Sequence, residues 1–358
     1  MKNGSMTEYE SDDAPHRRTT FFVRWAIGLA IGAVSVWVAV SAAGGFAEAW
    51  VAVRELDVAW LVAAFVVEAA SYLVLGAKLR RLIGPEVVSS IEATELGLIV
   101  SGFGLLTPAR PAEGLAITAG QLRRHGLSRR RVTMILGVSE WFSTRMFLGL
   151  AAINLLVVAV VERDPLTDLW PFMVIAVAVL GLLGASARLA SRPGAAERIS
   201  QFVGSFRRPS RRLSVRARRA AGAEWYREAR LFVGPPRRRV VLAALTAIAV
   251  LADVACLWFA LRAAGAHVGF DIAMLAITVA AFAVFVPLVP GGLGIVEAAI
   301  PAVTRHYGVP FEQGLAAALA YRALGTFLPA GAGALAIVHL RMHASASDAH
   351  EPRPVPIE

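Results

Sequence analysis

Stretches of about 20 apolar residues recur along this chain, and each is long enough to cross a membrane. A helix rises about 1.5 Å per residue, so about 20 residues span the ~30 Å hydrocarbon core of a bilayer. Hydrophobic residues make up 57% of the 358 residues, and the mean hydropathy is +0.60. Soluble domains carry roughly 45–50% apolar residues. The sequence therefore predicts an all-α polytopic integral membrane protein.

The basic residues lie mainly between the apolar runs. The formal net charge is +10, and residues 191–239 hold 14 Arg and 3 Glu. This is the pattern of cytoplasmic loops, so it favours membrane topology over nucleic-acid binding. Two roles stay open for the basic loop: a topology determinant alone, or a contact with anionic headgroups at about 1 kcal/mol per basic residue.

Charge also divides the chain into a cytoplasmic polar tail (1–20), one membrane domain (21–342) and a polar C-terminal tail (343–358). Both termini are expected in the cytoplasm and the domain in the inner cell membrane, because Lys and Arg follow the cytoplasmic ends. We expect about six full spans: Phe21–Gly45, Val58–Ala77 (ending at Lys78 in the cytoplasm), Val132–Val161, Trp170–Ala190, Val240–Ala264 and Glu312–Leu340.

Two further apolar segments are interrupted by helix breakers. Ser101–Gly126 contains Pro108 and is flanked on both sides by cytoplasmic charge, so it predicts a re-entrant hairpin. Asp271–Val303 must enter and leave from outside if the last helix is to end in the cytoplasm. Paired broken helices are typical of transporters with inverted repeats, although eight spans with two proline kinks is the alternative. The second break contains Pro290, Gly291, Gly292 and Gly294.

Ionisable residues within the apolar segments need a partner or a function, because each costs about 2.5–3.5 kcal/mol on insertion scales. They are Glu68, Arg110, Glu113, Glu140, Arg145, Asp253, Arg262, Glu297 and Arg322. Glu297 could pair with Arg322, because the two lie in neighbouring elements. Arg110 or Arg145 could likewise pair with Glu113 or Glu140. Such pairs either fix helix register or line a polar cavity that admits a lipid headgroup, where Arg suits phosphate.

Four motifs resemble those of the lysylphosphatidylglycerol synthase transmembrane-region family, whose members are also described as flippase-like. They are LLTPARPAEG (Leu105–Gly114), GVSEWFSTRMF (Gly137–Phe147), PGGLGIVEAA (Pro290–Ala299) and YRALGTFLPAGAGALA (Tyr321–Ala336). The resemblance implies a membrane domain with re-entrant helices. In bifunctional members this domain is similar to a flippase for aminoacylated phosphatidylglycerol, and other members resemble partners in glycolipid, polyprenyl-phosphate or hopanoid pathways.

The resemblance assigns roles to residues of this chain. For substrate binding and translocation it implies Arg110, Glu113, Glu140, Arg145, Glu297, Tyr321 and Arg322. For shaping the hairpins it implies Pro108, Pro290, Gly291, Gly292 and Gly294. Only 18 residues follow Leu340, so we expect the aminoacyl-transferase domain to be missing.

Three functions fit these observations. The preferred one is a flippase that moves a phospholipid or a polyprenyl or glycolipid headgroup, with anionic phospholipid or polyprenyl phosphate as its lipid partner. The alternatives are a non-catalytic partner of a lipid-modifying enzyme or glycosyltransferase, and a lipid-linked transferase. No HExxH, GxSxG or P-loop motif is present, so the transferase is the least favoured of the three functions. The His residues lack metal-ligand spacing, so no cofactor or metal is expected.

Overall fold

The computed structural model describes residues 45–103, 111–161, 231–284 and 294–348, with a few isolated positions such as Gly292. Every regular element within these residues is a helix. The predicted all-α class is therefore confirmed. Two predicted spans, Phe21–Gly45 and Trp170–Ala190, lie mostly outside the described residues.

Four long apolar helices make this a multi-pass membrane protein. They are α3 (Val58–Ile83), α7 (Arg129–Val161), α11 (Pro236–Ala263) and a continuous helical run over Phe311–Leu340. The last run comprises α14 (Phe311–Arg322), a π-helical segment η3 (Ala323–Phe327) and α15 (Leu328–Asp348). Four of the predicted spans therefore correspond to helices that are long and apolar enough to cross a membrane.

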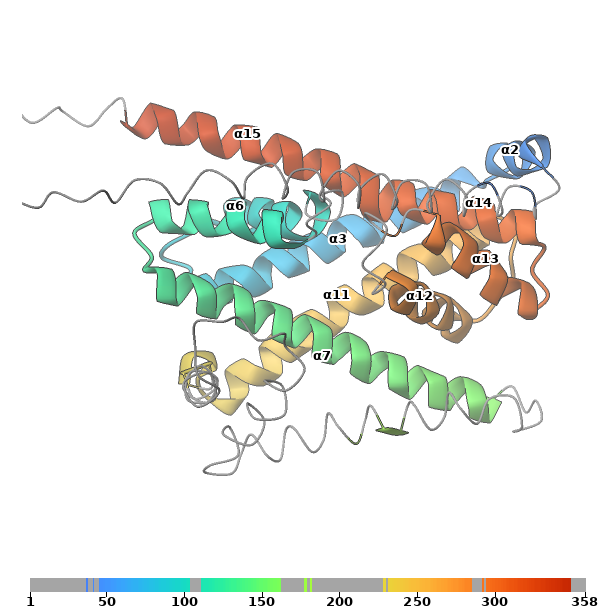
Figure 1. Ribbon diagram of the computed structural model, residues 1–358, viewed down its shortest axis with the longest axis horizontal. Coiled ribbons are helices and arrows are strands. Elements are labelled where there is room, and N and C mark those ends of the chain that lie inside the picture. The colour runs from blue at the N-terminus through green and yellow to red at the C-terminus, as the bar shows by residue number, and fades with distance from the viewer. Residues whose placement is uncertain are drawn as a thin grey trace, which may run out of the picture.

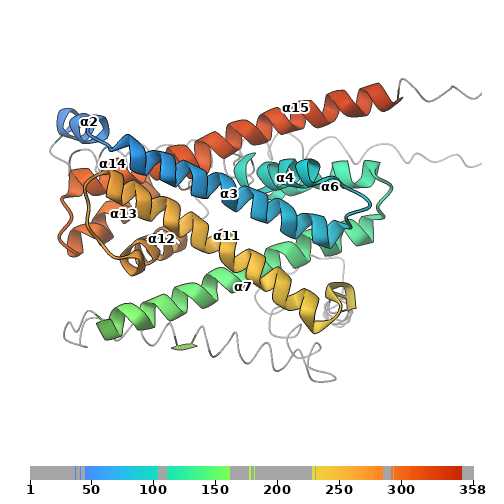
Figure 2. The ribbon, with the colours of Figure 1, turned by 180° about the vertical axis from the view of Figure 1, so that it is seen from behind.

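Helix α3 shows how the sequence sets these elements. The Asp57 carboxylate caps its start by accepting from the N–H of Ala59 at 2.8 Å, and Gly84 ends it with a φ of 124°. Large apolar side chains such as Phe65 and Leu73 are exposed on its outer face, as expected of a helix that faces lipid. Its other face packs along α11, and Figure 2 shows the two helices side by side.

Two pairs of short helices fill the opposite ends of the bundle (Figure 1). At one end α4 (Ser90–Gly97) continues into the π-helix η1 (Leu98–Phe103), which packs against α6 (Pro111–Arg124). At the other end α12 (Phe270–Val284) packs against α13 (Ile295–His306). The two proline-containing breaks of the sequence lie between the helices of each pair, almost entirely outside the described residues.

The turn before α13 requires glycine. Gly292 and Gly294 have φ angles of 65° and 81°, in the left-handed region that residues with a Cβ rarely adopt. Glycine has the backbone freedom that these two angles need. The other residues assigned to the hairpins, Pro108, Pro290 and Gly291, lie outside the described residues, as does Arg110.

Two buried apolar cores hold the ends of the bundle together. One joins α11, α12, α13 and α14 around Leu257, Leu261 and Ile300. The other joins the end of α3 to α4, α6 and the start of α7 around Leu82, Leu96 and Ile135. Between these cores the side chains facing inward become polar.

Candidate functional site: a polar cavity inside the helix bundle

A cavity of about 510 Å³ lies inside the bundle, bounded by α3, η1, α7, α11, α12, α13, α14 and η3. Two acidic side chains, Glu68 and Asp253, and two basic ones, Lys78 and Arg322, line it. Its other polar lining residues are Ser71, Tyr72, Ser101, Ser143, Thr144, Thr246, Tyr321 and Thr326. Charges of both signs thus face one space in a domain whose outer surface is apolar.

Arg322 occupies one wall of this cavity and is held by a buried network. Its Nε donates to Glu297 Oε1 at 3.0 Å, and its Nη1 donates to Thr326 Oγ1 at 3.2 Å. Glu297 is 4% exposed, and its Oε2 accepts from the N–H of Gly294 at 2.7 Å. One oxygen of the Glu297 carboxylate therefore caps the start of α13 and the other orients Arg322. These two bonds explain why a carboxylate follows the glycine turn before α13.

The carboxylates of Glu68 and Asp253 form the acidic part of the wall. The Tyr321 hydroxyl donates to Asp253 Oδ1 at 2.9 Å, linking α14 to α11. Glu68, on α3, is 5% exposed, and its Oε2 has no hydrogen-bond partner. The Cys256 thiol of α11 lies within hydrogen-bonding reach of the Glu68 carboxylate.

Lys78 lies inside the bundle, so its predicted position at the cytoplasmic end of a span is wrong. Its side chain is 2% exposed, and Nζ donates to Ser143 Oγ of α7 at 2.9 Å. The reason is that α3 continues through Ile83, which moves its basic end beyond Lys78 to Arg80 and Arg81. The Glu140 carboxylate of α7 interacts electrostatically with Lys78.

The structure brings together some of the residues assigned to the site and separates others. Tyr321 and Arg322 line the cavity, with Glu297 directly behind Arg322. Glu140 is exposed, and the Arg145 guanidinium lies 4.6 Å from the centre of the Trp141 ring, so neither lines the cavity. The side chain of Glu113, at the start of α6, lies outside the described residues, and Arg110 does so entirely.

Sequence reasoning did not assign three charged residues that line the cavity. Glu68 and Asp253 were signalled by their position within apolar runs, but no motif surrounds them. Lys78 had no such signal, because a Lys near the end of an apolar run is typical of a membrane boundary. Only the packing of α3 against α7 and α11 shows that the three face a common space.

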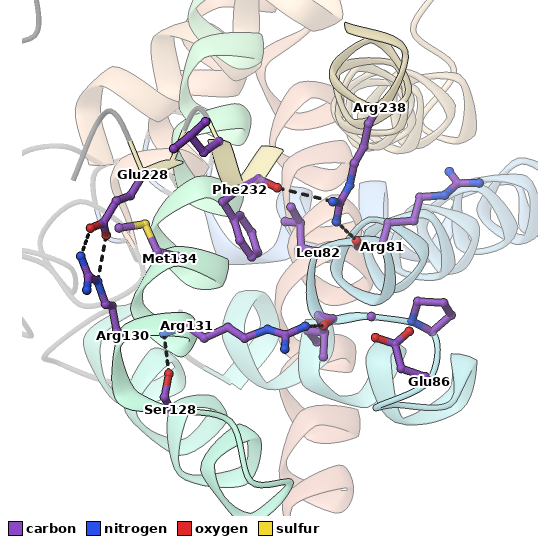
Figure 3. Close-up of a pocket in the computed structure, with 14 residues that line it drawn as sticks. Arg81, Leu82, Glu86, Ser128, Arg130, Arg131, Met134, Glu228, Phe232 and Arg238 are labelled. Atoms are coloured by element: carbon purple, nitrogen blue, oxygen red, sulfur yellow. Dashed lines mark hydrogen bonds and ion pairs between the residues drawn. The ribbon is translucent and has the colours of Figure 1, made fainter. Parts of the chain in front are cut away.

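A second pocket of about 860 Å³ lies at the Arg-rich end of the bundle (Figure 3). There Arg130 forms an ion pair with Glu228, and Arg131 Nη2 donates to the carbonyl of Ile83 at 3.0 Å. Arg238 Nη1 donates to the carbonyl of Phe232 at 3.4 Å, and Nη2 to that of Arg81. These arginines therefore join the end of α3 to the starts of α7 and α11.

Histidine side chains pair with carboxylates near this end as well. His125 contacts Glu92, and His339 Nδ1 lies 2.7 Å from Glu95 Oε1, which ties α15 to α4. Among the described residues, no group of three His, Cys, Asp or Glu side chains is arranged to hold a metal ion.

The fold and the cavity together define a helical multi-pass membrane protein with a charged internal site. The model of the family described as "Lysylphosphatidylglycerol synthase TM region" matches residues 25–333. This match covers most of the chain, and the protein belongs to this family. A comparison with curated proteins found no match to the chain.

Proposed function

We propose that the protein translocates lipid headgroups, which pass through the polar cavity while the acyl chains stay in the bilayer. The observation that carries this proposal is the placement of the buried Glu68, Lys78 and Arg322, with the half-buried Asp253, around one space of about 510 Å³. Buried charges in a membrane domain are costly and mark substrate or ion pathways. Membership of the family supports a lipid-related role.

The basic groups of the cavity favour a headgroup that contains phosphate. Arg322 presents a planar fork of N–H donors from α14, and Lys78 presents an ammonium from α3. An anionic phospholipid or a polyprenyl phosphate carries the matching charge. The apolar outer face of α3, with Val62, Phe65 and Val66 exposed, offers a surface for the acyl chains.

The topology of the proposed transporter has the Arg-rich end in the cytoplasm. Arg80 and Arg81 lie in the last turn of α3, and Arg129 begins α7. These two helix ends line the pocket of Figure 3 through Arg81 and Arg130, and such basic ends are typical of the cytoplasmic side. We place the protein in the inner cell membrane on this basis, with both termini in the cytoplasm. The pocket then lies where headgroups of the inner leaflet are available.

The two pairs of short helices are proposed to be re-entrant hairpins that enter from opposite sides, in an inverted arrangement with six full spans. Their location at opposite ends of the bundle supports this topology (Figure 1). Single cysteines introduced at Gly120 and Gly308 in a Cys256→Ala background test it with an impermeant thiol reagent. Labelling of Gly120→Cys from the cytoplasm and of Gly308→Cys from outside is expected. Labelling of both from the same side would contradict it.

Transport itself is tested with purified protein in liposomes that contain a trace of fluorescent phosphatidylglycerol. A membrane-impermeant reductant bleaches the outer leaflet, and the protein is expected to expose the inner-leaflet probe to bleaching. An Arg322→Gln, Lys78→Met double variant serves as the matched control, because it removes both cations from the cavity. Unchanged bleaching kinetics with phosphatidylglycerol, other anionic phospholipids and polyprenyl phosphate would overturn the proposal.

A further inference from the structure

Glu68 has the geometry of a binding site for a small cation. Its side chain is almost completely buried on α3, it lines the cavity, and its Oε2 has no hydrogen-bond partner. An ionised carboxylate in this position leaves a full negative charge uncompensated in a low-dielectric setting. A bound proton removes that charge and turns the unpartnered oxygen into a donor.

Asp253 completes the site from the neighbouring helix. It lines the same cavity on α11, and its charge acts directly on Glu68. Asp253 Oδ1 already accepts the hydroxyl of Tyr321 at 2.9 Å. Two carboxylates that line one cavity in a low-dielectric setting repel each other when both are ionised, and one bound proton relieves that repulsion.

The groups around the pair leave its charge unbalanced. From α3 these are Tyr72 and Lys78, from α11 Cys256, from α14 Tyr321 and Arg322, and from α13 Glu297 behind Arg322. The lining residues described on α7, α12 and η3 are uncharged.

Neither cation of the cavity neutralises the pair. Arg322 is bound to Glu297, and Lys78 is ten residues from Glu68, about 15 Å along α3. Within the described part of the chain, neither Glu68 nor Asp253 forms an ion pair, although Lys78, Arg322 and the pair all line the same cavity.

We propose that Glu68 and Asp253 together bind one exchangeable proton, and that its uptake and release are coupled to headgroup movement. This inference rests on the proposed function and names its driving ion. An O–H bond forms at a carboxylate oxygen with a proton from water on one side of the membrane. The same bond breaks to water on the other side, and no electrons are transferred.

The geometry favours a proton over a metal cation. A hard cation such as Ca²⁺ takes six to eight oxygen ligands, and Mg²⁺ takes about six. The described site offers the two carboxylates and the Tyr321 hydroxyl, whereas the Ser71 hydroxyl already donates to the Glu68 carbonyl at 2.7 Å. A proton needs only the unpartnered oxygen of Glu68.

The proposal is tested in the liposome assay under imposed gradients. With wild-type protein, a pH gradient is expected to change the rate of phosphatidylglycerol translocation several-fold, whereas a Na⁺ gradient at equal pH leaves it unchanged. Glu68→Gln and Asp253→Asn keep the side-chain shapes and are expected to abolish the response to the pH gradient. The control Glu55→Gln, at an exposed position after α2, is expected to respond as wild type.

Each other outcome has a defined meaning. If the translocation rate does not depend on the pH gradient, the inference is overturned and the proposed function is unaffected. If the rate responds to the Na⁺ gradient alone, the inference is overturned and Na⁺ is the coupling ion. If the wild type moves no lipid, the proposed function fails. Infrared difference spectroscopy of the purified protein then decides the inference: a pH-dependent protonated-carboxyl band should be present in wild type and lost in folded Glu68→Gln, and its absence from wild type overturns the proton site.

Discussion

Arg322 and Glu297 form a buried ion pair in which Nε lies 3.0 Å from Oε1. The pair joins the last residue of α14, where the helix changes to its π-helical segment, to the first turn of α13. Since Glu297 also accepts from the N–H of Gly294, one carboxylate fixes both the glycine turn and the guanidinium that faces the cavity. The order of this region therefore depends on Glu297.

Removing the Glu297 charge should destabilise the protein strongly. Glu297→Ala leaves the Arg322 guanidinium buried without its partner, and breaking such a pair costs about 3–5 kcal/mol. A large drop in melting temperature of the detergent-purified protein is expected, with partial recovery in the Glu297→Leu, Arg322→Met double variant. The control is Glu95→Gln, whose partner His339 is half exposed, so about 0–1 kcal/mol is expected. Equal melting temperatures for Glu297→Ala and Glu95→Gln would contradict this prediction.

Gly314 allows α14 to lie close against α13. A Cβ added there would lie 2.7 Å from Thr304 Oγ1 and 2.9 Å from Pro301 Cα, and the latter is a backbone atom that cannot move alone. Gly314→Ala should therefore cost about 1–3 kcal/mol by overpacking. Gly331→Ala is the matched control on α15, because its Cβ would meet nothing within 4 Å. The melting temperature should fall for Gly314→Ala and should stay the same or rise for Gly331→Ala. The reverse order would show that α14 and α13 are not tightly packed at Gly314.

Much of the fold could be predicted from the sequence because membrane helices are set by length and hydropathy. The apolar runs at Val58–Ala77, Val132–Val161 and Val240–Ala264 each correspond to a helix in the structure. The pairing of Glu297 with Arg322 was also predictable, since two opposite charges in adjacent apolar elements each need a partner.

The composition of the cavity could not be predicted from the sequence, for a physical reason. A helix in a membrane is apolar on the lipid side and largely apolar inside, so the sequence of α3 does not show which face turns inward. The burial of Lys78 depends on how far α3 extends, and the meeting of Glu68 with Asp253 depends on how α3 packs along α11. The π-helical segments Leu98–Phe103 and Ala323–Phe327 were not predicted, because they satisfy no distinct periodic pattern.

Tyr321 should stabilise the protein through its hydrogen bond to Asp253. Tyr321→Phe removes only the hydroxyl that donates to Oδ1 at 2.9 Å, and a hydrogen bond to a charged group contributes about 1.5–3 kcal/mol. Tyr72→Phe is the control, because Tyr72 is a second buried tyrosine that lines the same cavity from α3. A thermal-melt cycle with Asp253→Leu should show coupling between Tyr321 and Asp253; additive effects would indicate that the bond contributes nothing.

Lys78 should set the preference of the cavity for anionic lipids. Its ammonium is fixed by Ser143 of α7, so it is positioned to receive phosphate at the cavity wall. Lys78→Met keeps the length and removes the charge. A loss of 1.4 kcal/mol in binding the phosphate corresponds to about a tenfold slower translocation of phosphatidylglycerol when transport is limited by that contact.

A zwitterionic probe separates loss of this charge from general damage. Phosphatidylcholine carries its own cation beside the phosphate, so Lys78→Met should slow its translocation less than that of phosphatidylglycerol, and Lys78→Arg should retain the preference. Arg123→Met, at an exposed position on α6, is the charge-matched control and should behave as wild type. If Lys78→Met slows both lipids equally, Lys78 acts through the packing of α3 on α7. If Lys78→Met slows neither lipid, the headgroup does not pass the part of the cavity that Lys78 lines. A buried ammonium beside the path of the headgroup would otherwise attract its phosphate.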